Sequence, residues 1–244
     1  NDTKVTTFPD LSGINFVGTD IWIANNQNLS GTIDLSSVGS VNMLYIKIQQ
    51  NPLLTGLHAP DFVPTLSDNL DISQNTSLTT FRGLNSLSTV GGSLQIAGTV
   101  ASAFPILNNL TSINQSLIIG SNQGISNLNW LPSLSYIGGV LQVTNNTNLS
   151  NCSIDVVCDF ISGAGTRFVF GNTGCCLNET VLTNACNGTG SSGIEICDGI
   201  DNDCDGFIDE DFDQDGDGFT TCQGDCDDQN PFVHPGAEGI CECY

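Results

Sequence analysis

Basic residues are almost absent from this chain. Its 244 residues include four Lys and Arg against 26 Asp and Glu, and the formal net charge is −22. This balance excludes nucleic acid as a main partner, because binding to a phosphate backbone requires a basic surface. The chain has no basic cluster that would bind anionic lipid, and no apolar run long enough to cross a bilayer. We therefore expect no nucleic-acid binding and no membrane insertion.

The sequence begins at Asn1 and shows neither Met nor a charged segment followed by an apolar one. We interpret this start as the product of signal-peptide cleavage and expect a secreted protein, located outside the cell or at the cell surface. Eleven cysteines support an oxidising compartment, in which disulfides persist. The disulfide candidates are Cys152, Cys158, Cys175, Cys176, Cys186, Cys197, Cys204, Cys222, Cys226, Cys241 and Cys243.

The number of cysteines is odd, so one thiol is either free or paired outside the chain. Five of them lie between residues 152 and 186, and six lie between residues 197 and 243. Connectivity cannot be read from these positions. A disulfide from Cys176 to the C-terminal group would leave that group with the odd thiol and would dock the two parts of the chain.

Asn-x-Ser/Thr sequons are frequent and agree with secretion. The glycosylation candidates are Asn28, Asn75, Asn109, Asn114, Asn145, Asn148, Asn151, Asn178 and Asn187. The alternative is that a sequence rich in Asn, Ser and Thr produces sequons by chance.

What the sequence has in abundance is one repeated phrase, apolar-x-Ile/Val-x-x-Asn-x-x-Leu. Its copies begin at Ile21, Ile46, Leu70, Leu94, Leu117 and Leu141. Starts that lie about 24 residues apart predict the stacked coils of a solenoid. Within a coil the strand side chains alternate, so residues 70 and 72 should point inward and residue 71 outward.

The Asn of each phrase is expected to bend the chain and to form an inward-facing ladder, because Asn tolerates left-handed backbone and bonds neighbouring backbone groups. Thr99 takes the Asn place in the fourth copy. In the second half of a coil, apolar residues recur every three positions, for example from Leu78 to Val90, which suits a 3₁₀-like or kinked extended path. The pairs Gly91-Gly92 and Gly138-Gly139 are expected to supply positive φ at turns.

The phrase GLNSLSTVGGSLQI, residues 83–96, resembles the receptor L domain family of leucine-rich-repeat relatives. The resemblance covers about residues 15–186, and the segment from Asn151 through FVFGNTGC to Cys186 is similar to the cysteine-bearing C-terminal cap of that family. It implies a mainly β fold, a right-handed parallel β-solenoid with such a cap, and no particular ligand. The chain departs from the family at Thr99 and at Cys176, an extra thiol beside Cys175.

A change of composition marks a domain boundary. Residues 187–194 are rich in Gly and Ser and predict a linker. They separate a solenoid domain, residues 1–186, from residues 195–244, which contain 16 acids and no Lys or Arg.

The acidic domain contains two Asp-x-Asp-x-Asp-Gly loops, which begin at Asp201 and Asp213. Oxygen atoms at alternate positions converge on one ion, and the Gly allows the sharp turn of a calcium loop. We predict about two Ca²⁺ ions, bound among Asp201, Asp203, Asp205, Asp209, Glu210, Asp213, Asp215, Asp217, Asp225, Asp227 and Asp228. The loops are not EF-hands, because Phe212 and Gly224 stand where a bidentate Glu is needed.

The segment from Cys197 to Glu238 resembles an Asp- and Cys-rich metal-binding motif of secreted bacterial proteins, and more distantly the calcium-wrapping thrombospondin type 3 repeats. That resemblance implies a small disulfide-rich calcium-binding coil domain. The alternatives are a disordered acidic tail, a copper site, for which His234 is the one His of the tail, and a zinc site at Cys222 and Cys226.

Solenoids of this general shape include polysaccharide-processing enzymes, which need paired carboxylates, or a carboxylate with Arg or Lys, in one groove. The acids of the solenoid are few and scattered, at Asp20, Asp34, Asp61, Asp68, Asp71, Asp155 and Asp159. His58 is the one candidate imidazole base, and it has no partner nearby in the sequence. We therefore expect no catalytic activity, although residues distant in sequence can still meet.

Two non-enzymatic functions remain. The first is a secreted adhesion or structural module, whose solenoid binds a protein or glycan at the cell surface and whose acidic domain is stabilised by calcium. The second is a self-assembling subunit of an extracellular, glycosylated fibre, because parallel coils leave unpaired strand edges at the ends of the stack. The β-prone segment Asp2–Phe8 would then be donated to a neighbouring copy.

Overall fold

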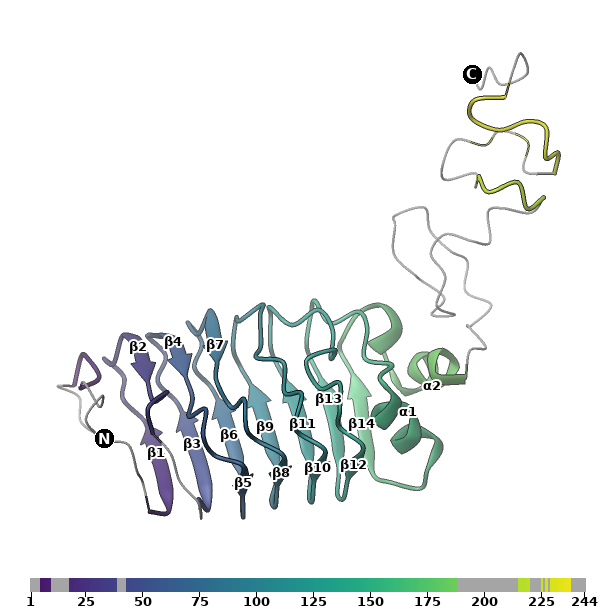
Figure 1. The fold of residues 1–244 in the computed structure, drawn as a ribbon. Helices are drawn as coiled ribbons and strands as arrows, with labels where there is room; N and C mark the ends of the chain where they lie inside the picture. Colours follow the sequence, from purple (N-terminus) through teal and green to yellow (C-terminus); the bar gives the residue numbers. More distant parts are fainter. Residues whose placement is uncertain are drawn as a thin grey trace. The chain divides into compact units, whose positions relative to one another are not determined.

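The computed structural model describes residues 5–9, 18–38, 43–187, 215–219, 225, 227 and 229–237. The chain divides into two compact units, Asn1–Glu179 and Thr180–Tyr244. The first unit is a parallel β-solenoid, which confirms the predicted fold class (Figure 1). Most of the predicted linker, residues 188–194, lies outside the described residues. None of the helices in the described part of the chain has the length and apolar character needed to span a bilayer.

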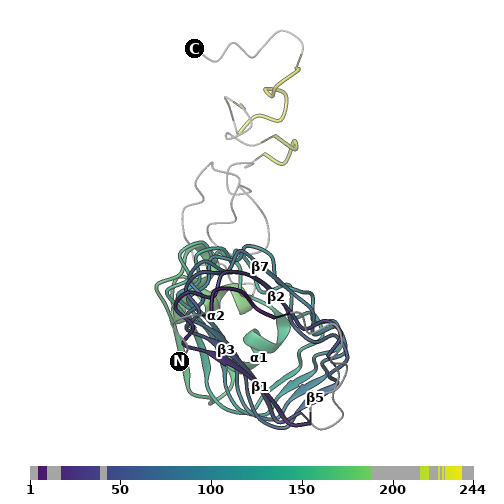
Figure 2. The same ribbon diagram turned by 90° about the vertical axis from the view of Figure 1, so that its left-hand side faces the viewer.

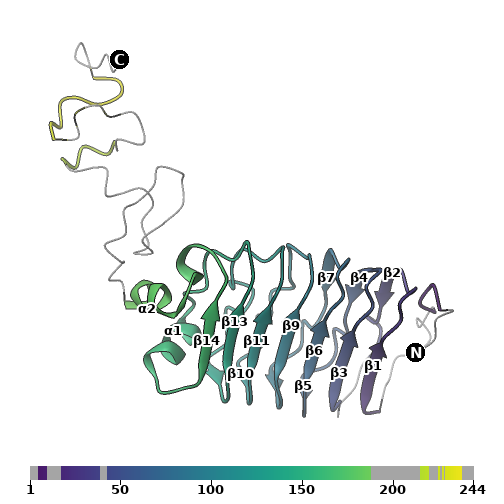
Figure 3. The same ribbon diagram turned by 180° about the vertical axis from the view of Figure 1, so that it is seen from behind.

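Three parallel sheets form the sides of the solenoid (Figures 1 and 3). The largest has the order β1 (Asp20–Ala24), β3 (Tyr45–Gln49), β6 (Leu70–Ser73), β9 (Leu94–Ala97), β11 (Leu117–Gly120), β13 (Leu141–Thr144) and β14 (Arg167–Phe170). The second has the order β12 (Tyr136–Ile137), β10 (Ser112–Ile113), β8 (Thr89–Val90) and β5 (Thr65–Leu66). The third has the order β2 (Gly31–Asp34), β4 (Leu54–His58) and β7 (Thr80–Arg82).

In the view along the solenoid the coils surround a common axis (Figure 2), and the buried apolar side chains form the core inside them. Leu70 and Ile72 of β6 are fully buried, as the alternation predicts. The residues at three-residue steps are buried as well, from Leu78 to Val90. Their path is made of turns and short strands rather than of 3₁₀ helix, so the kinked extended alternative is the correct one. Each coil therefore buries apolar side chains from all of its sides.

A ladder of buried Asn side chains joins successive coils, as predicted. The backbone N–H and the Nδ2 of Asn122 both donate to Oδ1 of Asn146, at 3.0 and 3.1 Å, and Asn146 donates in the same way to Asn172 at 3.0 Å. Nδ2 of Asn122 also donates to the carbonyl of Ile96, at 2.9 Å. Thr99 takes part through its own N–H and hydroxyl, which both donate to Oδ1 of Asn122 at 3.1 Å. The ladder thus satisfies polar groups that no water reaches.

The predicted position of the left-handed backbone is wrong by one residue. The residue before each ladder position adopts positive φ, and the ladder Asn itself does not. The left-handed residues are Asn25, Gln50, Gln74, Gly98, Ser121, Asn145 and Gly171, with φ between 54° and 70°. Only two of them are Gly, so five coils hold a side chain in a conformation that costs energy. The left-handed residue turns the chain so that the side-chain amide of the following Asn points into the core. The hydrogen bonds of the ladder offset the energy of the left-handed conformation.

The reason predicted for the paired glycines is also wrong. Gly91, Gly92, Gly138 and Gly139 are absent from the residues with positive φ. A Cβ built on Gly91 would lie 2.4 Å from the carbonyl oxygen of Ser67 in the preceding coil, and one on Gly138 would lie 2.3 Å from that of Asn114. These glycines therefore allow the close approach of two backbones, which any side chain would prevent.

The C-terminal end of the solenoid is a cap that contains β14. Helix α1 (Asp155–Ser162) lies between β13 and β14 in the sequence, and its Val156, Val157 and Ile161 are buried. The 3₁₀ helix η1 (Gly174–Cys176) and helix α2 (Glu179–Asn187) follow. β14 extends the large sheet by a seventh strand, because its residues continue the register of β13.

The cap is cross-linked by a disulfide between Cys152 and Cys176. Cys176 is therefore a buried partner within the cap, and the hypothesis that it links to the C-terminal domain is wrong. Cys158, Cys175 and Cys186 are also disulfide-bonded. The six cysteines from 197 to 243 lie outside the described residues.

We predict that the change Asn122→Ala destabilises the solenoid by about 3 kcal/mol, because it removes the acceptor of the buried N–H and hydroxyl of Thr99 and the side-chain donor to Asn146. The exposed Asn114 provides the matched control, and Asn114→Ala should change the free energy of unfolding by less than about 0.5 kcal/mol. Urea denaturation followed by circular dichroism measures both. Equal effects of the two substitutions would contradict a stabilising ladder.

Candidate metal centre

Three carboxylates from two segments of the acidic domain lie together. One oxygen each from Asp215, Asp217 and Asp225 can be chosen so that all lie within 4.8 Å of one another. The first two belong to one Asp-x-Asp-x-Asp-Gly loop, and the third comes from the segment that follows. The structure thus brings together part of one loop and a downstream residue, and all three residues are among the predicted ligands.

The local backbone explains how the carboxylates converge. Oδ1 of Asp215 accepts a hydrogen bond from the N–H of Asp217 at 3.1 Å, and Oδ1 of Asp217 accepts one from the N–H of Phe219 at 2.9 Å. Gly216 and Gly218 have positive φ, at 74° and 94°. These alternate turns point successive Asp side chains to the same side. Asp215 and Asp217 thus each use Oδ1 to accept a backbone hydrogen bond within the loop.

The remaining oxygens of the cluster are suited to bind a cation. Asp225 is 5% exposed, and its Oδ1 accepts a hydrogen bond from the N–H of Asp227 at 3.0 Å. The Oδ2 atoms of Asp217 and Asp225 are buried and have no hydrogen-bond partner in the part of the chain that the structure describes. Buried carboxylate oxygens without donors are costly unless a cation neutralises them. The cluster therefore fits a metal ion bound through oxygen.

The other predicted ligands divide into two groups. Asp227 is exposed, and it contributes its backbone N–H to Asp225 rather than a carboxylate to the cluster. The rest lie outside the described residues, namely Asp201, Asp203, Asp205, Asp209, Glu210, Asp213 and Asp228. The first loop therefore stays a prediction.

His234, the candidate copper ligand, lies in a turn of the same domain. Its ring stacks on Phe219 with ring centroids 5.0 Å apart, and its Nδ1 faces the carbonyl of Pro235 at 3.2 Å. His234 is not one of the three residues that converge in the cluster. The donor set found there is carboxylate alone, which suits hard cations better than copper.

Comparison with known families gives two matches. A family model described as Receptor L domain matches residues 64–186, half of the chain, which includes the coils from β5 onward and the cap. The chain belongs to the receptor L domain family. A second model, described as "Putative metal-binding motif" and named for copper binding, matches residues 191–210 and 225–242. No curated protein and no solved structure gives a significant match.

The second match places Asp225 inside a metal-binding motif and leaves the loop of Asp215 and Asp217 between its two matched segments. The structure adds that loop to the same site. Family match and geometry therefore point to one metal centre, although the name of the family and the chemistry of the cluster suggest different metals.

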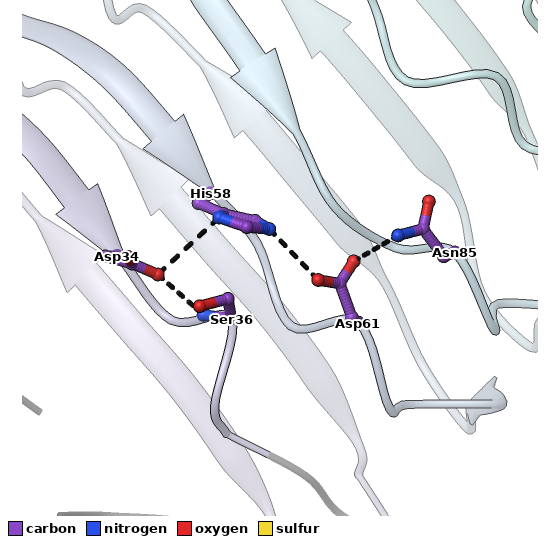
Figure 4. Close-up of polar contacts among 5 residues, drawn as sticks. All are labelled: Asp34, Ser36, His58, Asp61 and Asn85. Carbon is purple, nitrogen blue, oxygen red and sulfur yellow. Dashed lines mark hydrogen bonds and ion pairs between the residues drawn. The ribbon is translucent and has the colours of Figure 1, made fainter. Parts of the chain in front are cut away.

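A polar chain crosses the coils of the receptor L domain at His58 (Figure 4). Nε2 of His58 lies 3.0 Å from Oδ2 of Asp61, and its Nδ1 lies 3.7 Å from Oδ1 of Asp34. Nδ2 of Asn85 then donates to Oδ1 of Asp61 at 2.6 Å. The expectation that His58 has no partner nearby in the sequence is therefore wrong, because Asp61 lies three residues further on. Asp34 and Asn85 belong to the neighbouring coils, and the 24-residue spacings from Asp34 to His58 and from Asp61 to Asn85 were the available signal. Through these contacts, the coil that contains His58 and Asp61 is joined to Asp34 of the preceding coil and to Asn85 of the next coil.

The sequons of the receptor L domain differ in exposure. Asn75 is fully buried in the ladder, and its Nδ2 donates to the carbonyl of Ile48 at 2.8 Å. A glycan would occupy that same nitrogen, so the prediction at Asn75 is wrong for the folded chain. Exposed sequon side chains stay candidates, at Asn28, Asn109, Asn114, Asn145, Asn148 and Asn151. Asn178 is half-buried, and the side chain of Asn187 lies outside the described residues.

The Asp34 end of the polar chain predicts a pH dependence. Hydrogen bonds from the side chain and backbone of Ser36, together with nearby His58 and Arg82, hold the pKa of Asp34 below its usual value. A carboxyl with a lowered folded-state pKa adds stability above its unfolded pKa, about 3.9, and loses it as the pH falls through the folded value. Asp34→Asn should therefore cost stability at neutral pH, by less than about 1 kcal/mol because the side chain is exposed.

The difference between Asp34→Asn and wild type should vanish at about pH 2, where both forms are uncharged at this position. Urea denaturation at the two pH values measures it. A difference that grows toward acid pH would contradict the sign of the shift.

Proposed function

We propose that this protein is a secreted, calcium-stabilised adhesion or structural protein of the cell surface or extracellular space, without catalytic activity. The solenoid is its interaction surface, for a protein or glycan at the cell surface. The convergence of Asp215, Asp217 and Asp225 carries the proposal, together with the buried Oδ2 atoms of Asp217 and Asp225, which have no partner among the described residues. Such a site costs stability when empty and returns it when a cation binds.

The donor set favours calcium over the other metals considered. Calcium takes six to eight oxygen ligands, and carboxylates from a flexible loop supply them without strict geometry. Zinc and copper prefer His and Cys ligands, which are absent among the three converging residues. We propose one Ca²⁺ at this cluster and a second at the loop that begins at Asp201, which gives about two ions per chain.

Three observations support an extracellular binding role. The five cysteines of the cap and of α2 are disulfide-bonded, which indicates an oxidising environment. Most sequons of the solenoid are exposed. The receptor L domain match over residues 64–186 is consistent with a binding protein rather than with the polysaccharide-processing enzyme that was weighed as an alternative.

Calcium titration of the full chain tests the proposal. We expect about two bound Ca²⁺ ions in wild type and about one in Asp225→Asn, because the substitution removes a buried charged ligand. Asp227→Asn is the matched control, since Asp227 is a neighbouring exposed Asp that does not enter the cluster, and it should keep both ions. Isothermal titration calorimetry measures stoichiometry and affinity.

Chelation provides a second readout of the same hypothesis. The acidic domain should melt at a lower temperature after treatment with EGTA, whereas the solenoid should melt unchanged. Identical melting of the acidic domain with and without chelator, or tighter binding of Cu²⁺ than of Ca²⁺, would refute a calcium site.

A self-assembling fibre subunit is the second candidate, and the N-terminal end of the large sheet supports it. Among the described strands, only β3 pairs with β1, so the other edge of β1 has no strand partner there. The carbonyl of Thr6 accepts a hydrogen bond from the N–H of Ser30 at 3.0 Å, which places this residue of the predicted donor segment on its own first coil. An open strand edge allows a second copy to add by strand pairing.

Sedimentation velocity at high protein concentration, with calcium present, tests self-assembly. A fibre subunit should show species that grow with concentration, and electron microscopy should show filaments that dissociate after chelation. A single monomeric species at every concentration would exclude this second function and leave the first.

A further inference from the structure

The outward face of the large sheet carries one straight row of side chains. The strands pair in register, so one outward position of each strand lies beside that of the next. From β1 to β14 the row consists of Trp22, Lys47, Asp71, Gln95, Ile118, Gln142 and Phe168. Neighbouring members are about 4.8 Å apart, the spacing of paired strands. The row therefore runs across the strands along the axis of the stack.

A pocket of about 370 Å³ opens at the β1 end of this row. Its lining includes Trp22, Tyr45, Lys47, Asp71 and Gln95, which come from four adjacent coils. The volume is that of a small-molecule site. The pocket is mixed in character, with an aromatic side at β1 and β3 and a polar side at β6 and β9.

The aromatic side is a preformed platform. Trp22 is 63% exposed, which is costly for so large an apolar side chain. Tyr45 packs edge-on against it with ring centroids 6.4 Å apart, and Nζ of Lys47 lies 5.7 Å from the centre of the indole ring. These contacts hold the indole in one orientation while leaving part of its surface open. A fixed, exposed Trp in a pocket is suited to stack on the flat apolar face of a ligand.

The polar side contains a carboxylate with unmet hydrogen bonding. Oδ1 of Asp71 is buried and has no hydrogen-bond partner among the residues that the structure describes. Lys47 stands beside Asp71 on the neighbouring strand, yet its ammonium lies over Trp22 and forms no ion pair with Asp71. A rotation of the carboxylate about its last torsion, which is soft for Asp, presents this oxygen to the pocket. A hydroxyl donor there would satisfy it.

We propose that this pocket and row bind an uncharged oligosaccharide, an extended β-1,4-linked chain that lies across the strands. One pyranose ring offers its apolar face to Trp22, and a ring further along the same chain offers hydroxyl donors to Asp71, which stands two strands away. Its repeat along an extended chain is similar to the strand spacing, so successive rings meet successive coils. The proposal rests on the proposed binding function of the solenoid and names the ligand class of that surface.

The charge of the pocket lining favours neutral sugars over acidic ones. Two carboxylates, Asp68 and Asp71, line the pocket with one ammonium, that of Lys47. The net charge of −22 adds long-range repulsion of anions. Acidic glycans and phosphorylated ligands are therefore disfavoured, and neutral hydroxyl-rich chains are accepted.

Titration of the full chain with cellohexaose, in calcium-containing buffer, tests the site. Heat measures affinity, and tryptophan fluorescence reports on the platform, because Trp22 is 63% exposed whereas Trp130, the other Trp, is 6% exposed. We expect Trp22→Ala to weaken binding about tenfold through lost stacking. Asp71→Asn should weaken it by at least about tenfold through a lost charge-assisted hydrogen bond. Both side chains point outward, so the fold should tolerate these changes.

Phe62→Ala is the matched control, because Phe62 is a 66% exposed aromatic that lies outside the large sheet. Its affinity for cellohexaose should equal that of wild type. Hexagalacturonate, an acidic chain of the same length, should bind at least about tenfold more weakly than cellohexaose because of the surrounding carboxylates.

Three results would overturn the proposal. The first is no binding of cellohexaose by a preparation that binds calcium as expected, which leaves the calcium-stabilised module intact. The second is binding that Trp22→Ala does not weaken. The third is self-association that Trp22→Ala abolishes, because this face would then be an interface between copies of the chain. Failed calcium binding, with saccharide binding retained, would instead reject the calcium site alone.

Discussion

The solenoid depends on one interaction, the side-chain ladder that runs through its core beside the large sheet. Each ladder amide is buried, so it must find donors and acceptors within the protein. It finds them only when the next coil stands in one register, because Oδ1 of Asn146 accepts both the N–H and the Nδ2 of Asn122. Apolar packing alone would tolerate a sliding coil, whereas a displaced amide would leave buried polar groups unsatisfied. The ladder therefore fixes the register between successive coils, which apolar packing alone would leave variable.

The fixed register of the coils also determines how side chains are arranged on the outward face of the strands. When each coil repeats the position of the one before, outward side chains line up in straight rows, and residues 24 apart in the sequence become neighbours. This brings Trp22 beside Lys47 and Lys47 beside Asp71, and it joins Asp34, His58 and Asn85 through one polar chain. The surface that we propose for binding is thus produced by the hydrogen bonds of the core.

The two domains satisfy their buried polar groups in different ways. The solenoid buries long apolar side chains and satisfies its buried amides internally. The described part of the acidic domain has little apolar core, and the buried Oδ2 atoms of Asp217 and Asp225 have no donor among the described residues. An amide carries both donor and acceptor and can complete its bonds with copies of itself, whereas a carboxylate only accepts. A ladder of Asn therefore closes without a ligand, and a cluster of Asp requires a cation.

The sequence by itself determined the period of the coils, the inward alternation of the strands, the ladder position and the alternating carboxylates, because each follows from spacing along the chain. Other features depend on which backbone lies against which. The left-handed residue before each ladder Asn, the clash that demands Gly91, the pairing of Cys152 with Cys176 and the burial of the Asn75 sequon all arise between coils. Local spacing cannot report such contacts, since they exist only after folding has placed residues far apart in sequence within a few ångströms of each other.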